Sequence, residues 1–116
     1  MSRILFISPM VPTTDLSASA GFLVGALGFK EVFNEDGYGI CERDGLTIHF
    51  LPAGSNVGQM ETYIEVDDVD DVWEGMKDKV GDIKHKEPFD RPYGMREIHV
   101  ELPATKCLLF IGQSIT

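Results

Sequence analysis

The sequence predicts an α+β domain built from two βαβββ repeats. An Asp suited to cap a helix is followed 13 residues later by a Gly, at 15–28 and again at 68–81. Similar apolar runs, 48–51 and 108–111, close the two halves. One helix and four strands cannot cover their own faces, so the two units must pair. We expect a curved mixed sheet with its helices outside and its inner face partly open.

The first repeat opens with a strand-like run at 4–7, which leads into Pro9 and Pro12. Two prolines prevent a central strand from running straight through, so we expect this strand to be bent, at an edge or used as an arm. Asp15 then fits a helix N-cap and Gly28 a left-handed stop, because apolar residues follow at helical spacing between them.

Three short strands are expected after this helix, at 29–34, 38–42 and 46–51. Asp-Gly pairs separate them, which is typical of antiparallel hairpins. Residues 52–58 are rich in turn formers and lie near the midpoint of the chain, so they read as a linker.

The second repeat follows the same order. A strand at 61–66 precedes a helix that begins after Asp68 and ends at Gly81, with Trp73 in its apolar stripe. Strands are expected at 83–87, 95–101 and 106–111.

Length and charge limit the function. The 116 residues fit one domain, 1–116, with repeat one at about 1–54 and repeat two at about 57–116. A net charge of −9 disfavours nucleic acid and anionic membrane as partners. The N-terminal apolar run is too short for a signal peptide or a membrane span, so we expect a cytoplasmic protein.

The hairpin from Arg91 to Gln113 carries the clearest functional signal. Pro92 and Gly94 flank Tyr93 just before a strand of alternating residues, and such a constrained elbow can present an aromatic ring to a cavity. Cys41 and Cys107 are expected to be buried free thiols, because they sit in apolar strands without Cys-x-x-Cys spacing.

The chain resembles the vicinal oxygen chelate superfamily, which includes glyoxalase I, extradiol dioxygenases and the bleomycin resistance proteins. The segments that carry the resemblance are Pro9 with 11–15, 27–29, 43–47 and 93–97. Each motif is weak alone, but they occur in order and at matching spacing over essentially the whole chain.

The resemblance implies four metal-ligand positions, which fall on Ser8, His49, Glu61 and Leu109. Leucine has no lone pair, and a serine hydroxyl is a poor ligand for Zn²⁺ or Ni²⁺. We therefore expect a degenerate metal site, no metal and no other cofactor. His49 is then interpreted as a cavity-lining or hydrogen-bonded strand histidine.

With its metal positions eroded, the chain is most similar to the bleomycin resistance branch, which binds its ligand without catalysis. The resemblance implies a groove lined by aromatic residues, here Phe33, Tyr38, Tyr63 and Tyr93. His49 and Glu61 are expected in the same ligand-binding site. We expect a planar, cationic small-molecule ligand such as a glycopeptide antibiotic, because ring faces attract cations.

Arg96 is expected to orient the groove floor, the alternative being an ion pair or strand hydrogen bond with its neighbour Glu97. His85 and His99 are expected to be ordinary surface or strand residues. The resemblance also implies a homodimer in which the first strand is exchanged between chains at Pro9. Two alternatives remain open: a metal-dependent lyase, isomerase or dioxygenase around His49 and Glu61, and a dimeric module with no small ligand.

Overall fold

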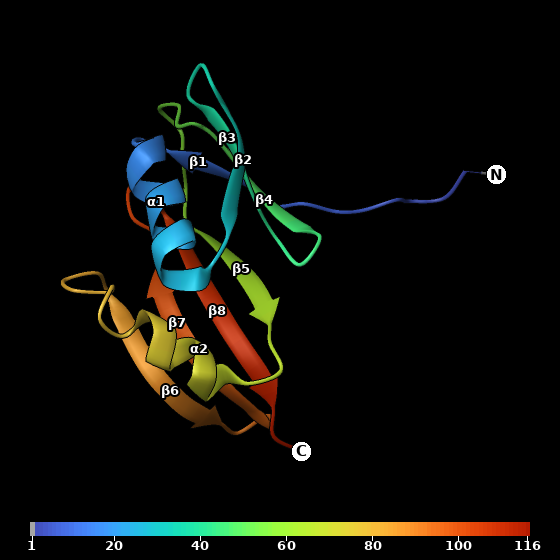
Figure 1. Ribbon diagram of the computed structural model, residues 1–116, viewed down its shortest axis with the longest axis vertical. Helices are drawn as coiled ribbons and strands as arrows, with labels where there is room; N and C mark the ends of the chain where they lie inside the picture. Colours follow the sequence, from blue (N-terminus) through green and yellow to red (C-terminus); the bar gives the residue numbers. More distant parts are fainter. Residues whose placement is uncertain (1) are drawn as a thin grey trace.

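The computed structural model describes residues 2–116. Within that range it contains eight strands and two helices, arranged as two four-stranded sheets (Figure 1). In chain order the elements are β1 (Met10–Thr13), α1 (Leu16–Leu27), β2 (Lys30–Glu35), β3 (Tyr38–Arg43), β4 (Leu46–Pro52), β5 (Met60–Glu65), α2 (Val69–Met76), β6 (His85–Arg91), β7 (Met95–Glu101) and β8 (Cys107–Ser114).

The two halves have the same topology, which confirms the predicted α+β fold and its βαβββ repeat. The strand order is β1-β4-β3-β2 in the first sheet and β5-β8-β7-β6 in the second. The first strand of each half pairs in parallel with its last, and the remaining pairs are antiparallel. The sheets are mixed, as expected. Within one chain they are two separate hydrogen-bonded sheets rather than one continuous sheet.

Helix α1 begins and ends where the sequence predicts. The Asp15 side chain accepts a hydrogen bond from the Ala18 amide at 3.2 Å, and Gly28 ends the helix in the left-handed conformation at φ 71°. Helix α2 also begins after its predicted cap, Asp68, but it ends at Met76 instead of continuing to Gly81. The chain tightens there, because the Lys79 amide donates to the Met76 carbonyl at 2.8 Å, an i to i−3 contact.

The first strand lies later in the chain than predicted. Residues 4–7 form no strand, whereas β1 begins at Met10 and contains Pro12. Pro12 is tolerated because β1 is an edge strand of its sheet, with β4 on one side only. The N-terminal segment projects away from the rest of the chain (Figure 1), and its residues Ile4, Leu5, Phe6 and Ile7 are 74–85% exposed.

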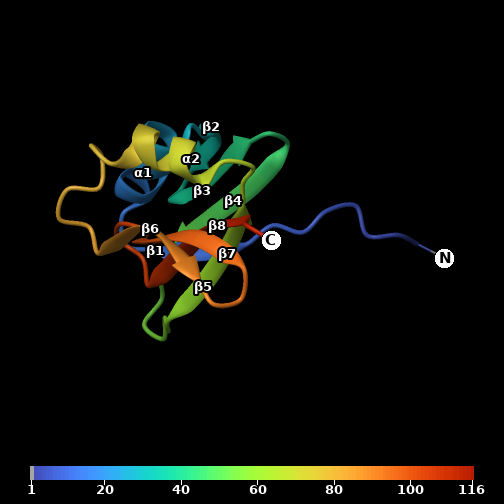
Figure 2. The same ribbon diagram turned by 90° about the horizontal axis from the view of Figure 1, so that it is seen from below.

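Alternation along the strands assigns one face of each sheet to the core. Ile48 and Phe50 on β4, and Leu109 and Ile111 on β8, are at most 4% exposed and belong to the core cluster that includes residues of both helices. Figure 2 shows α1 and α2 side by side on one side of the molecule, and the two helices contact each other. Neither helix of residues 2–116 lies on the opposite face of either sheet. Within residues 2–116, neither helix is long and apolar enough to cross a membrane.

We call the uncovered face of the β1-β4-β3-β2 sheet the first open face, and that of the β5-β8-β7-β6 sheet the second open face. The side chains of the first open face that matter below are Met10, Phe33, Tyr38 and His49. Those of the second open face are Glu61, Tyr63, Glu65, Lys86, Phe89, Arg91, Glu97, His99 and Phe110, with Tyr93 at its end.

Candidate functional site

Three rings in contact cross the second open face from strand to strand. Strand pairing places His99 opposite Phe110, and Phe89 opposite Glu97, so the side chains share one face. The Phe89 and His99 rings meet edge to face with centroids 5.0 Å apart, and the His99 and Phe110 rings are 4.1 Å apart. This packing gives the face an aromatic floor.

Glu97 lies at the centre of a polar network on this floor. Its side chain is 3% exposed. The Tyr93 hydroxyl lies 2.9 Å from both of its carboxyl oxygens, and His99 Nε2 lies 2.8 Å from one of them. A carboxylate only accepts hydrogen bonds, so the His99 ring fits here with its proton on Nε2. Every buried polar side-chain atom within residues 2–116, including those of Glu97, has a hydrogen-bond partner.

The elbow before β7 explains how Tyr93 reaches this acid. Gly94 has φ 82°, and its amide donates to the Arg91 carbonyl at 3.1 Å, so the chain turns back on itself. Tyr93 precedes Glu97 by four residues, and the turn at Gly94 directs its side chain back over the start of β7, where its hydroxyl contacts Glu97. Its ring is 58% exposed and its hydroxyl is anchored. The predicted elbow therefore presents a ring to the open face.

Tyr63 joins the cluster from β5 because Gly112 leaves room for it. A Cβ at Gly112 would lie 3.1 Å from the Tyr63 ring, so the ring lies across β8 at this position. The partner of Gly112 on β7 is Glu97. Burial raises the pKa of the Tyr63 phenol to about 12, and the hydrogen bond to Glu65 and the nearby Glu65 and Glu97 charges add to this. The phenol is therefore neutral at physiological pH.

Two cationic side chains border the aromatic floor. The Arg91 guanidinium lies 5.0 Å from the Phe89 ring centre and 5.4 Å from that of Tyr93. Its Nε is 3.3 Å from the Tyr93 hydroxyl oxygen. The Lys86 ammonium is also 5.0 Å from the Phe89 ring centre. These distances are within the range of cation–π attraction.

The first open face carries a smaller aromatic group. The rings of Phe33 and Tyr38 are 6.2 Å apart, and those of Tyr38 and His49 are 5.8 Å apart, both edge to face. The Tyr38 hydroxyl and His49 Nδ1 are 2.7 Å apart. The predicted site residues thus form two groups within one chain, with Phe33, Tyr38 and His49 on one sheet and Glu61, Tyr63 and Tyr93 on the other.

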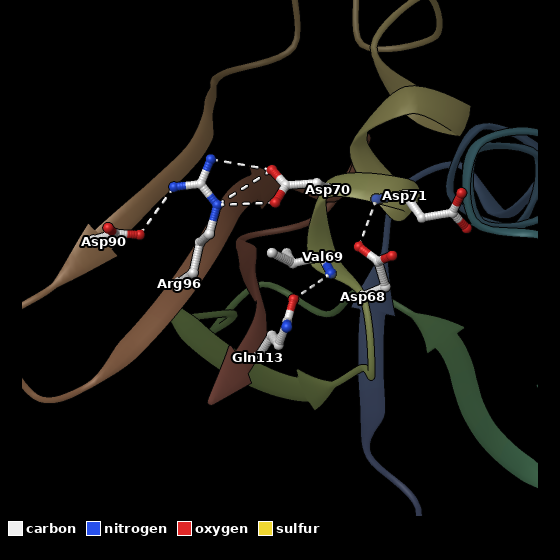
Figure 3. A network of polar contacts seen from close by, with 7 residues as sticks. All are labelled: Asp68, Val69, Asp70, Asp71, Asp90, Arg96 and Gln113. Atoms are coloured by element: carbon white, nitrogen blue, oxygen red, sulfur yellow. Dashed lines mark hydrogen bonds and ion pairs between the residues drawn. The ribbon is translucent and has the colours of Figure 1, made fainter. Parts of the chain in front are cut away.

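Arg96 does not belong to either group, and its predicted place in the groove floor is wrong. It lies on the opposite face of β7 from Glu97, where it binds Asp70 of α2 at 3.1 Å and Asp90 of β6 at 2.9 Å (Figure 3). The hydrogen bonds that the Arg96 guanidinium donates to the Asp70 and Asp90 carboxylates raise the pKa of Arg96. The neighbouring Val69 amide donates to the Gln113 side chain at 2.8 Å. Arg96 therefore ties the helix to the sheet.

The four predicted metal-ligand positions do not form a metal site. Ser8 exchanges hydrogen bonds with Thr47, and the Glu61 carboxyl accepts one from Gln59. Leu109 is fully buried on the helix face, and its neighbour Phe110 faces the way His49 does.

The alignment of the two apolar runs is therefore one residue out of register, and the position equivalent to His49 is Phe110. A phenylalanine donates no electron pair to a metal, and a serine is a poor ligand. No group of three His, Cys, Asp or Glu side chains within residues 2–116 is placed to hold a metal. The donor set does not fit the metal that the resemblance implies for enzymes.

The residues of the second open face that the sequence analysis did not place in the site include Phe89, Arg91, Glu97, His99 and Phe110. Glu97 was considered only as a partner of Arg96 in an ion pair or strand hydrogen bond, although adjacent strand residues point to opposite faces. The sequence did contain a signal for these residues. The elbow places Tyr93 just before a strand in which Glu97 and His99, two residues apart, share one face.

A separate cavity of about 470 Å³ lies between the β3–β4 turn and the end of β5. Its lining includes Leu46 of the turn, Val66 and Asp68 after β5, and Ile7 of the N-terminal segment. Tyr63 borders it as well. The cavity therefore adjoins the second open face without containing Glu97 or Tyr93.

Comparison with known proteins gives a family model and a set of similar folds. The sequence matches the model of the Glyoxalase/Bleomycin resistance protein/Dioxygenase superfamily over residues 5–106. No curated protein matches it. The bleomycin resistance determinant encoded on transposon Tn5 is similar in structure, with TM-score 0.79 and 21% identity over 97% of this chain and 100% of that one.

Two further structures show the breadth of this similarity. The bleomycin-binding protein of bleomycin-producing Streptomyces verticillus, complexed with copper(II)-bleomycin, has TM-score 0.76 and 21% identity over 96% of this chain and 97% of that one. Lactoylglutathione lyase from Agrobacterium tumefaciens has TM-score 0.75 and 17% identity over 97% of this chain and 96% of that one. At these identities the similarity establishes the fold alone.

Proposed function

The chain belongs to the glyoxalase/bleomycin resistance protein/dioxygenase superfamily, and within it we propose that this protein binds a planar small molecule without converting it. The observation that carries the proposal is the second open face, where the rings of Tyr63, Tyr93, Phe89 and Phe110 share one face with a buried acid, Glu97. The eroded metal positions favour binding over catalysis, because Lewis-acid chemistry needs ligands that Ser8 and Phe110 do not supply.

The ligand class follows from the chemistry of this face. Flat aromatic faces stack on planar heteroaromatic rings, and each ring can attract a cation with about 0.5–2 kcal/mol. The net charge of −9 adds long-range attraction for a positively charged molecule. A glycopeptide antibiotic such as bleomycin, which two of the similar structures are described as resisting or binding, has this character. Sequestration of such a drug would confer resistance without chemistry.

We further propose that the binding unit is a cytoplasmic homodimer. Four consecutive apolar residues, 4–7, are 74–85% exposed within one chain, which is a costly arrangement for an isolated molecule. An arm exchanged between two chains at Pro9 would cover them. The exchange would also allow the Phe33–Tyr38–His49 group of one chain to face the Tyr63–Tyr93 group of the other.

Deletion of residues 2–7 tests the dimer directly. We expect the full chain to sediment as a dimer and the shortened chain as a monomer, measured by analytical ultracentrifugation. A matched control replaces the arm with polar residues of equal length, which keeps the chain length and removes the apolar contacts. A monomeric full chain would contradict the dimer.

Isothermal titration calorimetry with metal-free bleomycin tests the binding function. We expect Tyr93→Ala to weaken binding by about 1–3 kcal/mol, as for the loss of a stacked aromatic anchor. Val24→Ala is the control, because Val24 is an exposed apolar residue on α1, away from both open faces. Equal affinity in Tyr93→Ala and the parent protein would remove the elbow from the site.

Metal analysis separates binding from the enzymatic alternative. A stoichiometric content of Ni, Fe, Mn or Zn that disappears in His49→Ala would replace the binding proposal with a metal-dependent lyase or dioxygenase. Absence of binding to bleomycin and to a panel of planar antibiotics would instead favour a dimeric module without a small ligand.

A further inference from the structure

Glu97 is a buried acid with no Lys or Arg in ion-pair contact among residues 2–116. Its side chain is 3% exposed, and the one basic group within ion-pair distance is His99, which is charged only when protonated. Removing a carboxylate from water is costly unless it is paired or fully hydrogen-bonded. A group that brings a positive charge to Glu97 would therefore be stabilised there.

Glu97 also has unused acceptor capacity. An ionised carboxylate offers about four acceptor sites. Its contacts supply two protons, one from the Tyr93 hydroxyl, which is shared between both oxygens, and one from His99. The surrounding rings limit how many waters can reach the remaining sites. An incoming N–H donor would thus find free acceptor sites on Glu97 while the bonds from Tyr93 and His99 stay in place.

The chain's own Arg91 marks where such a donor would sit. Its guanidinium lies over both Phe89 and Tyr93, at 5.0 and 5.4 Å from the ring centres, and its Nε reaches the Tyr93 hydroxyl. It makes no ion pair with Glu97. A cation therefore already occupies the mouth of the ring cluster, one hydroxyl away from the buried acid.

We propose that the second open face contains a subsite for an organic cation, in which Glu97 is the counter-charge and Tyr63, Tyr93 and Phe89 are the walls. The cation is an ammonium, amidinium or guanidinium group carried by a planar ligand, and it displaces Arg91 from the rings as it binds. The inference rests on the proposed binding function and specifies which part of the ligand the second repeat recognises.

The other charges of the face are compatible with this assignment. Glu61 and Glu65 stand on β5, on the same face as Glu97, whereas Lys86 and Arg91 stand on the edge strand β6. A cation entering between β5 and β7 passes acidic side chains. An anion would have to bind at the β6 edge, against Lys86 and Arg91, and this is the competing outcome that the experiment separates.

Three naphthalene probes of different charge test the subsite on the full chain. They are 1-naphthylmethylammonium, 1-methylnaphthalene and 1-naphthoate, which share a fused two-ring frame and carry an N–H-donating positive charge, no charge and a negative charge. Dissociation constants are measured by NMR titration of the labelled protein. We expect the cation to bind about tenfold or more tightly than the neutral ring, the range of one charge-assisted contact.

Variants then locate the preference. Glu97→Gln should remove most of the cation preference and leave the affinity for 1-methylnaphthalene within about twofold, because the walls remain. Glu101→Gln is the matched control, since Glu101 is an exposed acid on the same strand, and it should keep the preference. Arg91→Met should raise the cation affinity at least about threefold by removing the resident competitor.

The outcomes distinguish the subsite from the proposed function. If the neutral ring binds and the cation gains nothing in the parent protein, or if Glu97→Gln keeps the preference, the subsite is wrong and ligand binding by the rings stands. If 1-naphthoate binds best and Arg91→Met weakens it, the face recognises anions and the subsite is wrong. If no probe binds, the proposed function fails together with it. Should Glu97→Gln not fold, as judged by circular dichroism, a fall in cation affinity in Arg91→Met overturns the inference by itself.

Discussion

Replacing Tyr93 by Phe keeps the ring of the elbow and removes the hydroxyl that covers Glu97. In the parent protein this hydroxyl is 2.9 Å from both carboxyl oxygens of an acid that is 3% exposed. After the substitution His99 is the remaining hydrogen-bond partner of that acid. The change therefore leaves a buried acceptor with half of its donors.

The expected cost is about 1–2 kcal/mol of unfolding free energy. A hydrogen bond to a charged group contributes about 1.5–3 kcal/mol. The Tyr93 ring is 58% exposed, so water can enter beside the new Phe side chain and recover part of the loss. For a chain of this size the loss corresponds to a decrease in Tm of about 3–8 °C.

Tyr63→Phe is the matched control for this prediction. It removes a hydroxyl from a neighbouring ring, but that hydroxyl donates to Glu65, which is exposed to solvent. We expect less than about 0.5 kcal/mol of destabilisation, because water replaces an exposed hydrogen bond. Both variants are compared by urea unfolding monitored by circular dichroism. Equal effects of the two substitutions would refute the assignment of Glu97 as a buried acid that depends on Tyr93.

Three further predictions concern the surroundings of the site. Gly112→Ala should reduce ligand affinity more than stability, because its Cβ would lie 3.1 Å from the Tyr63 ring and force that exposed ring aside; calorimetry and urea unfolding of one variant decide this. Arg96→Met should cost less than about 1 kcal/mol and leave ligand affinity unchanged, since its partners Asp70 and Asp90 have side chains 61% and 64% exposed; any loss of affinity would return Arg96 to the site. The folded-state pKa of Tyr63, about 12, lies above its ordinary value of 10.0, so the unfolded chain loses this proton first and stability should fall between about pH 10 and pH 12; a Tyr63→Phe variant that falls equally steeply would count against it.

The fold was predictable because its signals are local and repeated. The Asp caps, the left-handed Gly28 and the Asp-Gly turns each set a boundary by themselves, and Asp36 and Asp44 indeed have φ 55°. The first strand was misplaced because residues 4–7 have strand-like composition, whereas pairing depends on which residues β4 can reach. The shift of one residue between Leu109 and Phe110 arose because two adjacent apolar residues do not reveal which one faces the helix.

The candidate site was only partly predictable. The alternation of apolar and polar residues along a strand shows which side chains share a face of the sheet, but not which side chains of other strands lie beside them. Tyr63 and Tyr93 were identified as aromatic residues of the site, and the structure places both on the second open face. The proximity of Tyr63 to Glu97 depends on Gly112 on the strand between them, which is a tertiary arrangement. Arg96 was misassigned because its partner Asp70 lies 26 residues away on α2.

Comparison of the two repeats indicates where the chemistry has diverged. Strand pairing makes Ile48 equivalent to Leu109 and Phe50 equivalent to Ile111, because His49 and Phe110 occupy matching places between them. These helix-facing pairs keep their apolar character, since each must fill the same space against a helix.

The open-face pairs differ in kind. They are Ser8 with Glu61, Met10 with Tyr63, His49 with Phe110, Ile40 with His99 and Tyr38 with Glu97. Packing alone does not require a buried acid where the other repeat has a tyrosine, and placing one in an aromatic floor costs free energy. Because the helix-facing positions show that the scaffold tolerates simple apolar residues, the acid and its rings fit the proposed subsite, in which the second repeat binds the charged part of the ligand. In a dimer that joins the first open face of one chain to the second open face of its partner, one side would then supply the Tyr38–His49 pair and the other the Glu97 cluster, so that the two ends of a single ligand are bound by different chemistry.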